Sequence, residues 1–352
     1  MSTITQSHRP AVAPAAAVRA TTRRRERAII AAIAVVALAL AAASLAIGAY
    51  TLPLPELLQT LAGQGTRSDN FIVFQLRMPR MLLAILVGAA FAVAGALFQT
   101  LLRNPLASPD IIGISGGASV SAAFAILVLG LSGAAVSLVA FLGAVVVASG
   151  IYLLAWRGGI TGFRFVLIGV GVAFMVQAVL NYLITRGDVR EVQQALVWLV
   201  GGLGSASWPD IAVVAASLAV LLPLVGVVAP RLRVLQLGDD TAGGLGVAPE
   251  RTRMLVLLLA VALVAVATAM VGPLAFVAFV SAPIARRMLG TGGLALVPSA
   301  LVGITLVLGA DFAAQHLLPG ELNVPAGIVT GLIGAPYLLW LLATTNRGGR
   351  GA

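Results

Sequence analysis

Long apolar runs separated by short polar segments dominate the chain. A helix that crosses a lipid bilayer needs about 20 mostly apolar residues. The apolar runs predict ten spanning helices, at residues 28–50, 79–102, 112–131, 134–156, 163–185, 210–229, 254–271, 273–289, 295–318 and 325–343. The pattern therefore predicts an all-α polytopic membrane protein with one transmembrane domain over residues 28–343.

The composition agrees with this class of protein. The chain has 352 residues, of which 60% are hydrophobic and only 10% are charged, and its mean hydropathy is +1.06. A soluble domain carries about 25% charged residues. The chain has no cysteine, which excludes disulfides and thiolate metal sites.

The basic residues indicate the orientation in the membrane. If the N-terminus is cytoplasmic and the chain crosses ten times, both termini are cytoplasmic. Of the 22 basic residues, all arginine, 17 then lie inside and five lie outside, namely Arg67, Arg77, Arg80, Arg186 and Arg190. This asymmetry follows the positive-inside rule. The net charge of +10 is spread over the ends of apolar runs, which favours membrane topology over nucleic-acid binding.

The terminal segments differ from the rest of the chain. Residues 1–27 are rich in Ala, Thr and Arg and lack an apolar face, so we expect a disordered cytoplasmic tail. Residues 344–352 form a second predicted cytoplasmic tail. A signal peptide is an alternative interpretation of the first apolar run. That run is long and nine others follow it, so a retained first helix is favoured.

Two segments between the predicted helices have a pattern of their own. Residues 186–210 lie outside and are amphipathic, with Trp198 and Trp208 suited to a membrane interface. Residues 231–253 form the longest predicted cytoplasmic loop, with two short apolar pieces broken by glycines. This loop is the best candidate for docking a soluble partner, and a plain solvated loop is the alternative.

No motif in the chain predicts catalysis. There is no phosphate-binding P-loop, and the two histidines, His8 and His316, make a histidine metal site improbable. Residues 113–117 (GISGG) fit the nucleophile elbow of α/β-hydrolases and the shorter motif of intramembrane serine proteases. However, the elbow needs an α/β domain, and the predicted topology places His316 near the opposite membrane face from Ser115. A packing role for Ser115 is therefore favoured.

Some polar and small residues inside the apolar runs are candidates for transport. Asp311 is ionisable within a predicted span and is a functional candidate on that ground, although a structural hydrogen bond explains it equally well. One such carboxylate is thin support for an ion-driven secondary carrier, which remains an alternative. Six of these residues are candidates for lining a translocation pathway: Gln99, Gly169, Gly171, Gln177, Gly327 and Gly331. Close packing between helices is the alternative explanation for them.

A set of motifs in a fixed order resembles one known family. They are Arg77-x-Pro79-Arg80 with Gly88, Gly95 and Gln99; Arg103-Asn104-Pro105-Leu106-Ala107-x-Pro109; Gly113-Ile114-Ser115 with Gly117-Ala118; Trp198 to Gly202; Leu237-Gly238 with Ala242 and Leu245-Gly246-Val247; Gly272-Pro273 with Phe276-Val277; Asp311; Pro325-x-Gly327; and Gly334-Ala335-Pro336. Over nearly the whole chain after the tail, it resembles the FecCD-type permeases of bacterial ABC importers for iron-siderophores, haem and cobalamin.

The resemblance implies a fold, partners and a function. It implies the type II ABC importer permease fold in the bacterial inner membrane, a second permease subunit, and two cytoplasmic ATPase subunits that bind ATP and magnesium. It also implies a lipoprotein outside the membrane that delivers the substrate. The chain itself would bind no cofactor and would pass a ferric-siderophore complex inward by alternating access. Haem or cobalamin is the alternative substrate within the family.

The resemblance also assigns residues to two of these contacts. Arg77 and Arg80 match arginines that meet acidic residues of the binding protein; helix capping or head-group anchoring is the alternative. The residues that match the ATPase-coupling region are Leu237, Gly238, Asp239, Asp240, Ala242, Leu245, Gly246 and Val247.

The chain departs from the family pattern at two places. Many members have Pro-His where this chain has Ala282-Pro283, and many have an arginine where this chain has Gln315. The second difference weakens the expectation of a third docking arginine. The Ala-Pro variant resembles the catecholate-siderophore branch, exemplified by ferric enterobactin permeases, in which two different permeases pair. We therefore favour a heterodimer over a homodimer.

Overall fold

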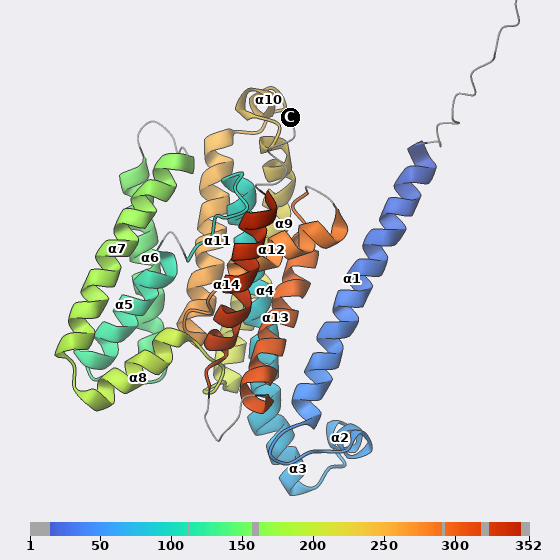
Figure 1. The fold of residues 1–352 in the computed structure, drawn as a ribbon, viewed down its shortest axis with the longest axis vertical. Coiled ribbons are helices and arrows are strands. Elements are labelled where there is room, and N and C mark those ends of the chain that lie inside the picture. Colours follow the sequence, from blue (N-terminus) through green and yellow to red (C-terminus); the bar gives the residue numbers. More distant parts are fainter. Residues whose placement is uncertain (1–14, 111–112, 157–161, 291–292, 318–323, 346–352) are drawn as a thin grey trace, which may run out of the picture.

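The computed structural model describes residues 15–110, 113–156, 162–290, 293–317 and 324–345. All regular secondary structure in these ranges is helical (Figure 1). The elements are α1 (Ala15–Ala46), α2 (Leu54–Leu61), α3 (Arg67–Phe71), a π-helical segment (Ile72–Arg77), α4 (Met78–Leu101), α5 (Ile114–Leu127), α6 (Ala134–Ala155), α7 (Gly162–Arg186), α8 (Val189–Val200), α9 (Trp208–Leu235), α10 (Asp239–Gly244), α11 (Pro249–Val271), α12 (Val277–Leu289), α13 (Leu296–His316) and α14 (Ala326–Thr345).

Every predicted span is found as a helix, but two of them are short. Within the described ranges, eight helices are long and apolar enough to cross a membrane. The runs predicted at 112–131 and 273–289 form only α5 and α12, of 14 and 13 residues. Both start late because the backbone before them adopts positive φ, at Gly113 (88°) and at Gly272 (71°) and Phe276 (65°). The ten predicted helices are therefore eight long and two short ones.

The boundaries at the N-terminal side also differ from the prediction. Helix α1 begins at Ala15 rather than at residue 28, because alanine and arginine are strong helix formers even without an apolar face. The second predicted span starts earlier too, since α3, the π-helical segment and α4 form one continuous helix from Arg67 to Leu101. A capping box between Thr66 and Asp69 starts it. Of the expected tails at residues 1–27 and 344–352, residues 15–27 and 344–345 are helical, and the rest lies outside the described residues.

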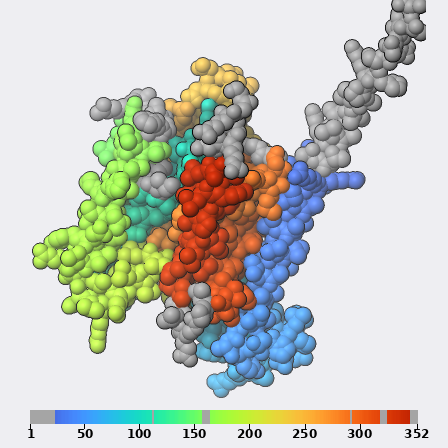
Figure 2. All heavy atoms as spheres, viewed as in Figure 1, coloured from blue at the N-terminus to red at the C-terminus, as the bar shows by residue number. Residues whose placement is uncertain are grey.

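Helix α4 is the centre of the bundle. It packs against α9, α11, α12 and α13, whereas α1 and α7 lie at opposite edges (Figures 1 and 2). Two glycines permit the closest approaches. A Cβ on Gly88 would lie 2.8 Å from the Gly303 carbonyl oxygen on α13, and one on Gly95 would lie 1.7 Å from the Ala278 carbonyl oxygen on α12. Small residues at helix crossings allow such backbone contact in membranes.

The crossing of α4 and α12 gives the first testable prediction. Replacing Gly95 by alanine should lower stability by about 1–3 kcal/mol, because overpacking forces the backbones apart. Thermal unfolding of the purified chain in detergent would measure the loss as a lower Tm. The matched control is Gly226→Ala on α9, where an added Cβ meets no atom within 4 Å. An unchanged Tm for Gly95→Ala would contradict the packing described.

Candidate docking, coupling and translocation sites

A salt bridge at one end of α4 joins that helix to α13. Arg80 Nη2 lies 2.8 Å from Asp311 Oδ1, and Arg80 Nε lies 2.9 Å from Oδ2, so the contact is bidentate. Asp311 is 5% exposed in its side chain, and Arg80 is 22% exposed. Gln315 Nε2 donates to Asp311 Oδ2 at 2.7 Å. Asp311 therefore has the structural role that the sequence left open, and Gln315 supports it.

Arg77, the other arginine of this motif, closes the end of α1. Its Nη1 donates to the carbonyl oxygens of Leu45 at 2.7 Å and Ala46 at 3.1 Å, and its Nη2 donates to the Tyr50 carbonyl oxygen. The last carbonyls of a helix have no partner within the helix, and a cation also favours the negative end of the helix dipole. Arg77 thus has the capping contacts that were the alternative to docking. Whether it also meets a partner is a separate prediction.

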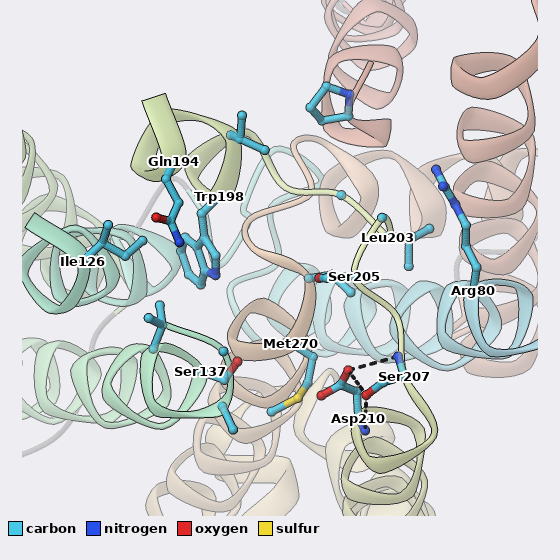
Figure 3. A pocket seen from close by; sticks show the side chains of 18 of the residues that line it. Arg80, Ile126, Ser137, Gln194, Trp198, Leu203, Ser205, Ser207, Asp210 and Met270 are labelled. Atoms are coloured by element: carbon cyan, nitrogen blue, oxygen red, sulfur yellow. Dashed lines mark hydrogen bonds between the residues drawn. The ribbon is translucent and has the colours of Figure 1, made fainter. Parts of the chain in front are cut away.

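A cavity of about 840 Å³ opens beside Arg80, between α6, α8, α11 and the segment that follows α8 (Figure 3). Trp198, Met270, Gln194 and Leu203 are among the residues that line it. Trp198, expected at a membrane interface, thus lies at a cavity within the chain. Trp208 is exposed, and its Nε1 donates to the Phe74 carbonyl oxygen at 3.0 Å. The lining of the cavity is more apolar than polar, and polar side chains such as Gln194, Ser205 and Asp210 also reach it.

At the other end of the bundle, α10 projects between α9 and α11 (Figure 1). Gly238 and Gly246 adopt φ of 108° and 79°, and these turns lead the chain into and out of the short helix. Arg253 on α11 holds α10 in place, with Nη2 at 2.8 Å from both carboxylate oxygens of Asp239. Ala242 is buried beneath, whereas Leu237 and Leu245 are 64% and 62% exposed.

The remaining coupling candidates occupy the same projection. Asp239, Asp240 and Gly246 are exposed, while Gly238 and Val247 are half-buried. The predicted coupling residues are therefore brought together on one surface element. The role of Arg253 in anchoring α10 was not predicted. The only sequence signal for it is that Arg253 follows Asp239 by 14 residues within a charged segment.

The candidate pathway residues fall into two groups. Gly171 and Gln177 lie on the exposed face of α7, and Gly331 on α14 is half-buried with room for a Cβ. In contrast, Gly169 is buried, and Gly327 approaches α8 so closely that a Cβ would lie 1.8 Å from the Val200 carbonyl oxygen. Gln99 is also buried, and its Nε2 donates to the Phe279 carbonyl oxygen at 2.8 Å. Packing explains the second group.

Ser115 and His316 lie far apart in the fold. Ser115 begins α5 and donates to the Asp110 carboxylate, while His316 ends α13, stacks on Phe312 at 4.6 Å and contacts the Phe312 carbonyl oxygen. Burial raises the pKa of Asp110, and the hydrogen bonds from Ser115 and Ser108 oppose that shift. The serine is a partner of this carboxylate and closes the α4–α5 turn.

These observations describe a polytopic helical membrane protein with a projecting short helix. The FecCD transport family model matches residues 27–344, and the chain belongs to this family. It is 40% identical over 301 residues to the ferric enterobactin transport system permease protein FepG of Escherichia coli (strain K12), covering 85% of this chain and 91% of the relative. It is 38% identical over 311 residues to the probable siderophore transport system permease protein YfhA of Bacillus subtilis (strain 168), covering 86% and 90%.

Solved structures agree with this assignment. The first is described as an inward-facing conformation of a metal-chelate type ABC transporter. It matches with a TM-score of 0.81 and 26% identity, and the match covers 90% of this chain and 99% of the other. A second, PsaBC from Streptococcus pneumoniae, matches in fold with a TM-score of 0.52 and 17% identity, covering 80% and 94%. The chain is thus a membrane permease of an ABC transporter.

The Arg80–Asp311 pair gives a second prediction. Asp311→Asn should lower stability by about 1–3 kcal/mol, less than the loss of a fully buried pair, because Arg80 keeps some contact with water. Thermal unfolding in detergent would measure it. The control is Asp188→Asn, which changes an exposed carboxylate and should alter Tm little. Equal Tm values for the two variants would show that the pair contributes nothing.

Proposed function

We propose that the chain is one of two permeases of an ATP-driven importer that moves a ferric-siderophore complex into the cytoplasm by alternating access. The observation that carries this proposal is the 40% identity to a ferric enterobactin permease across 85% of the chain. Relatives described as Fe(3+)-citrate and Fe(3+)-hydroxamate permeases support a ferric chelate over haem or cobalamin. Uptake of ⁵⁵Fe-labelled chelates by cells that rely on this permease would identify the substrate.

A second permease subunit would cover the exposed face of α7. Gln177 Nε2 donates to Asn181 Oδ1 at 2.9 Å, and both side chains are exposed in the single chain. Polar side chains within a spanning segment are costly against lipid and usually face protein or a water-filled space. We therefore assign Gly171, Gln177 and, on α14, Gly331 to the pathway or its subunit interface. The Ala282-Pro283 pair favours a heterodimer.

The ATPase subunits would dock at α10. Two leucines stand exposed on either side of this helix, at a site outside the spanning segments where lipid does not cover them. Arg253 holds α10 through Asp239. The exposed leucines beside this helix suit insertion into a groove on a soluble partner. ATP and magnesium would be bound by that partner, because this chain has no P-loop. A lipoprotein that binds the siderophore would meet the opposite end of the permease.

The coupling proposal predicts the effect of a charge at α10. Leu245→Glu should weaken ATPase binding at least tenfold, or about 1.4 kcal/mol, because a carboxylate would be buried without a partner. Co-purification of the ATPase and substrate-stimulated ATP hydrolysis would measure this. The matched control is Leu58→Glu on α2, where the leucine is 58% exposed at the other end of the molecule. Equal ATPase recovery for both variants would contradict the role of α10.

Docking of the binding protein is the proposed second role of Arg77 and Arg80. Arg80 uses Nε and Nη2 toward Asp311, so its Nη1 is not engaged in that pair and its side chain reaches the surface. A guanidinium carries five N–H donors, which allows Arg80 to hold Asp311 and meet a carboxylate of a partner at once. Such charge pairs mainly orient docking and speed association.

A charge exchange separates the two roles of Arg80. In the double variant Arg80→Asp/Asp311→Arg, the ion pair between α4 and α13 is kept, so Tm should recover much of what Arg80→Asp alone loses. Binding of the delivering lipoprotein should nevertheless stay at least tenfold weaker and depend less on salt, because Arg77 alone keeps its charge, measured with the purified importer. Normal binding and uptake in the double variant would restrict Arg80 to a structural role.

A further inference from the structure

A second, smaller cavity opens at the end of the bundle where α4 ends and α10 begins. Its volume is about 280 Å³, and its polar lining comes from Gln99, Thr100, Arg103, Asn104, Gln236 and Arg286. Gln99 and Thr100 form a buried floor, whereas Arg103, Asn104 and Gln236 form an exposed rim. None of the described residues that line this cavity carries a carboxylate.

Both arginines are oriented by neutral acceptors. Arg286 donates from Nη2 to Thr100 Oγ1 at 2.8 Å and from Nη1 to Gln99 Oε1 at 3.2 Å. It also donates from Nε to the Gly293 carbonyl oxygen at 3.2 Å. These contacts, with one from Nη2 to the Ala96 carbonyl oxygen at 3.3 Å, fix the half-buried guanidinium. No carboxylate among the residues that the structure describes forms an ion pair with it. Arg80 and Arg253, in contrast, are each paired with a carboxylate.

Arg103 is held at the rim by its backbone and by one hydrogen bond. It has a φ of 49°, in the left-handed region that glycine adopts without strain. Its Nη2 donates to the Leu235 carbonyl oxygen at 2.8 Å, close to Gln236 and the start of α10. An arginine at this position therefore has a strained backbone. Its guanidinium lines the cavity and is hydrogen-bonded to the end of α9, just before the segment that leads into α10.

We propose that this cavity binds a phosphate-type oxyanion, which supplies the missing counter-charge to Arg103 and Arg286. The N–H groups that the two guanidiniums do not already use, together with the side-chain amides of Asn104 and Gln236 at the rim, match the acceptor oxygens of a phosphate group. The volume lies just below the about 300–1,000 Å³ of clefts that take drug-sized ligands, which suits a phosphate group rather than a whole nucleotide or chelate. A bound anion would bridge α4, α12 and the end of α9.

Two sources could supply this chemistry. The arginine distribution places the cavity at the cytoplasmic surface, where basic pockets between spanning helices bind anionic lipid head groups. Free inorganic phosphate from the cytoplasm has the same oxygens. The test must therefore separate a lipid phosphate from a free one.

The experiment measures thermal unfolding of the full chain, purified in detergent with its accompanying subunits. It is titrated with inorganic phosphate and, separately, with short-chain phosphatidylglycerol; short-chain phosphatidylcholine and chloride of matched ionic strength are the controls.

Asn104→Asp is the variant that tests the charge of the cavity directly. Asn104 Oδ1 accepts from the Leu106 amide at 2.9 Å, and aspartate keeps this acceptor while placing a negative charge in the cavity rim. Arg103→Gln removes a rim charge, and Arg231→Gln, an exposed arginine outside the cavity lining, is the matched control.

The expected result is a saturable rise in Tm for the unmodified protein and for Arg231→Gln. The apparent affinity should fall at least tenfold in both Arg103→Gln and Asn104→Asp. Phosphate also stabilises proteins by exclusion from their surface, so the difference between variants is the measure. Saturation with phosphate identifies a free oxyanion as sufficient, and saturation with phosphatidylglycerol alone identifies a lipid head group. Equal shifts in all variants, or no saturation with either anion, would overturn the proposal.

Discussion

The need to pair polar groups where water is scarce organises this molecule around α4. In a bilayer an unsatisfied polar group costs several kcal/mol, and α4 carries polar side chains near both of its ends. At one end Arg77 meets the carbonyls that end α1, and Arg80 meets Asp311 of α13. At the other end Gln99 meets the Phe279 carbonyl and Arg286 of α12. The same constraint therefore attaches three other helices to the central one.

Close backbone contact complements these polar attachments. Lipid provides little hydrophobic driving force between helices, so packing depends on small residues that allow short distances. Gly88 and Gly95 permit this against α13 and α12. Helix α4 is thus fixed along its length, while α7 and α14 keep exposed faces suited to a second subunit. A closely packed α4 at the centre, with α7 and α14 exposed at the edges, is an arrangement that suits transport by relative movement of subunits.

The two ends of α4 also lie next to the two regions proposed to meet partners. The outer end carries Arg80 beside a large cavity, and the inner end leads to the arginine-lined cavity and, through the α9 terminus, to α10. Because helix packing and the Arg80–Asp311 ion pair join these regions through α4, α12 and α13, a partner that docked at either proposed site would act on the same group of helices. The serine and histidine that a hydrolase interpretation would need are separated by this arrangement.

The sequence by itself determined the membrane class, the helical runs and the family, because apolar length and motif order are local properties. It also singled out residues 237–247, which the structure gathers around the projecting helix α10. Tertiary structure decided the rest: the shortness of α5 and α12, the early start of α1, the partners of Arg77, Arg80 and Gln99, and the anchoring of α10 by Arg253. These contacts join residues from different helices, up to 231 positions apart for Arg80 and Asp311. Only the folded packing brings such residues together, so no local pattern of residues could have specified them.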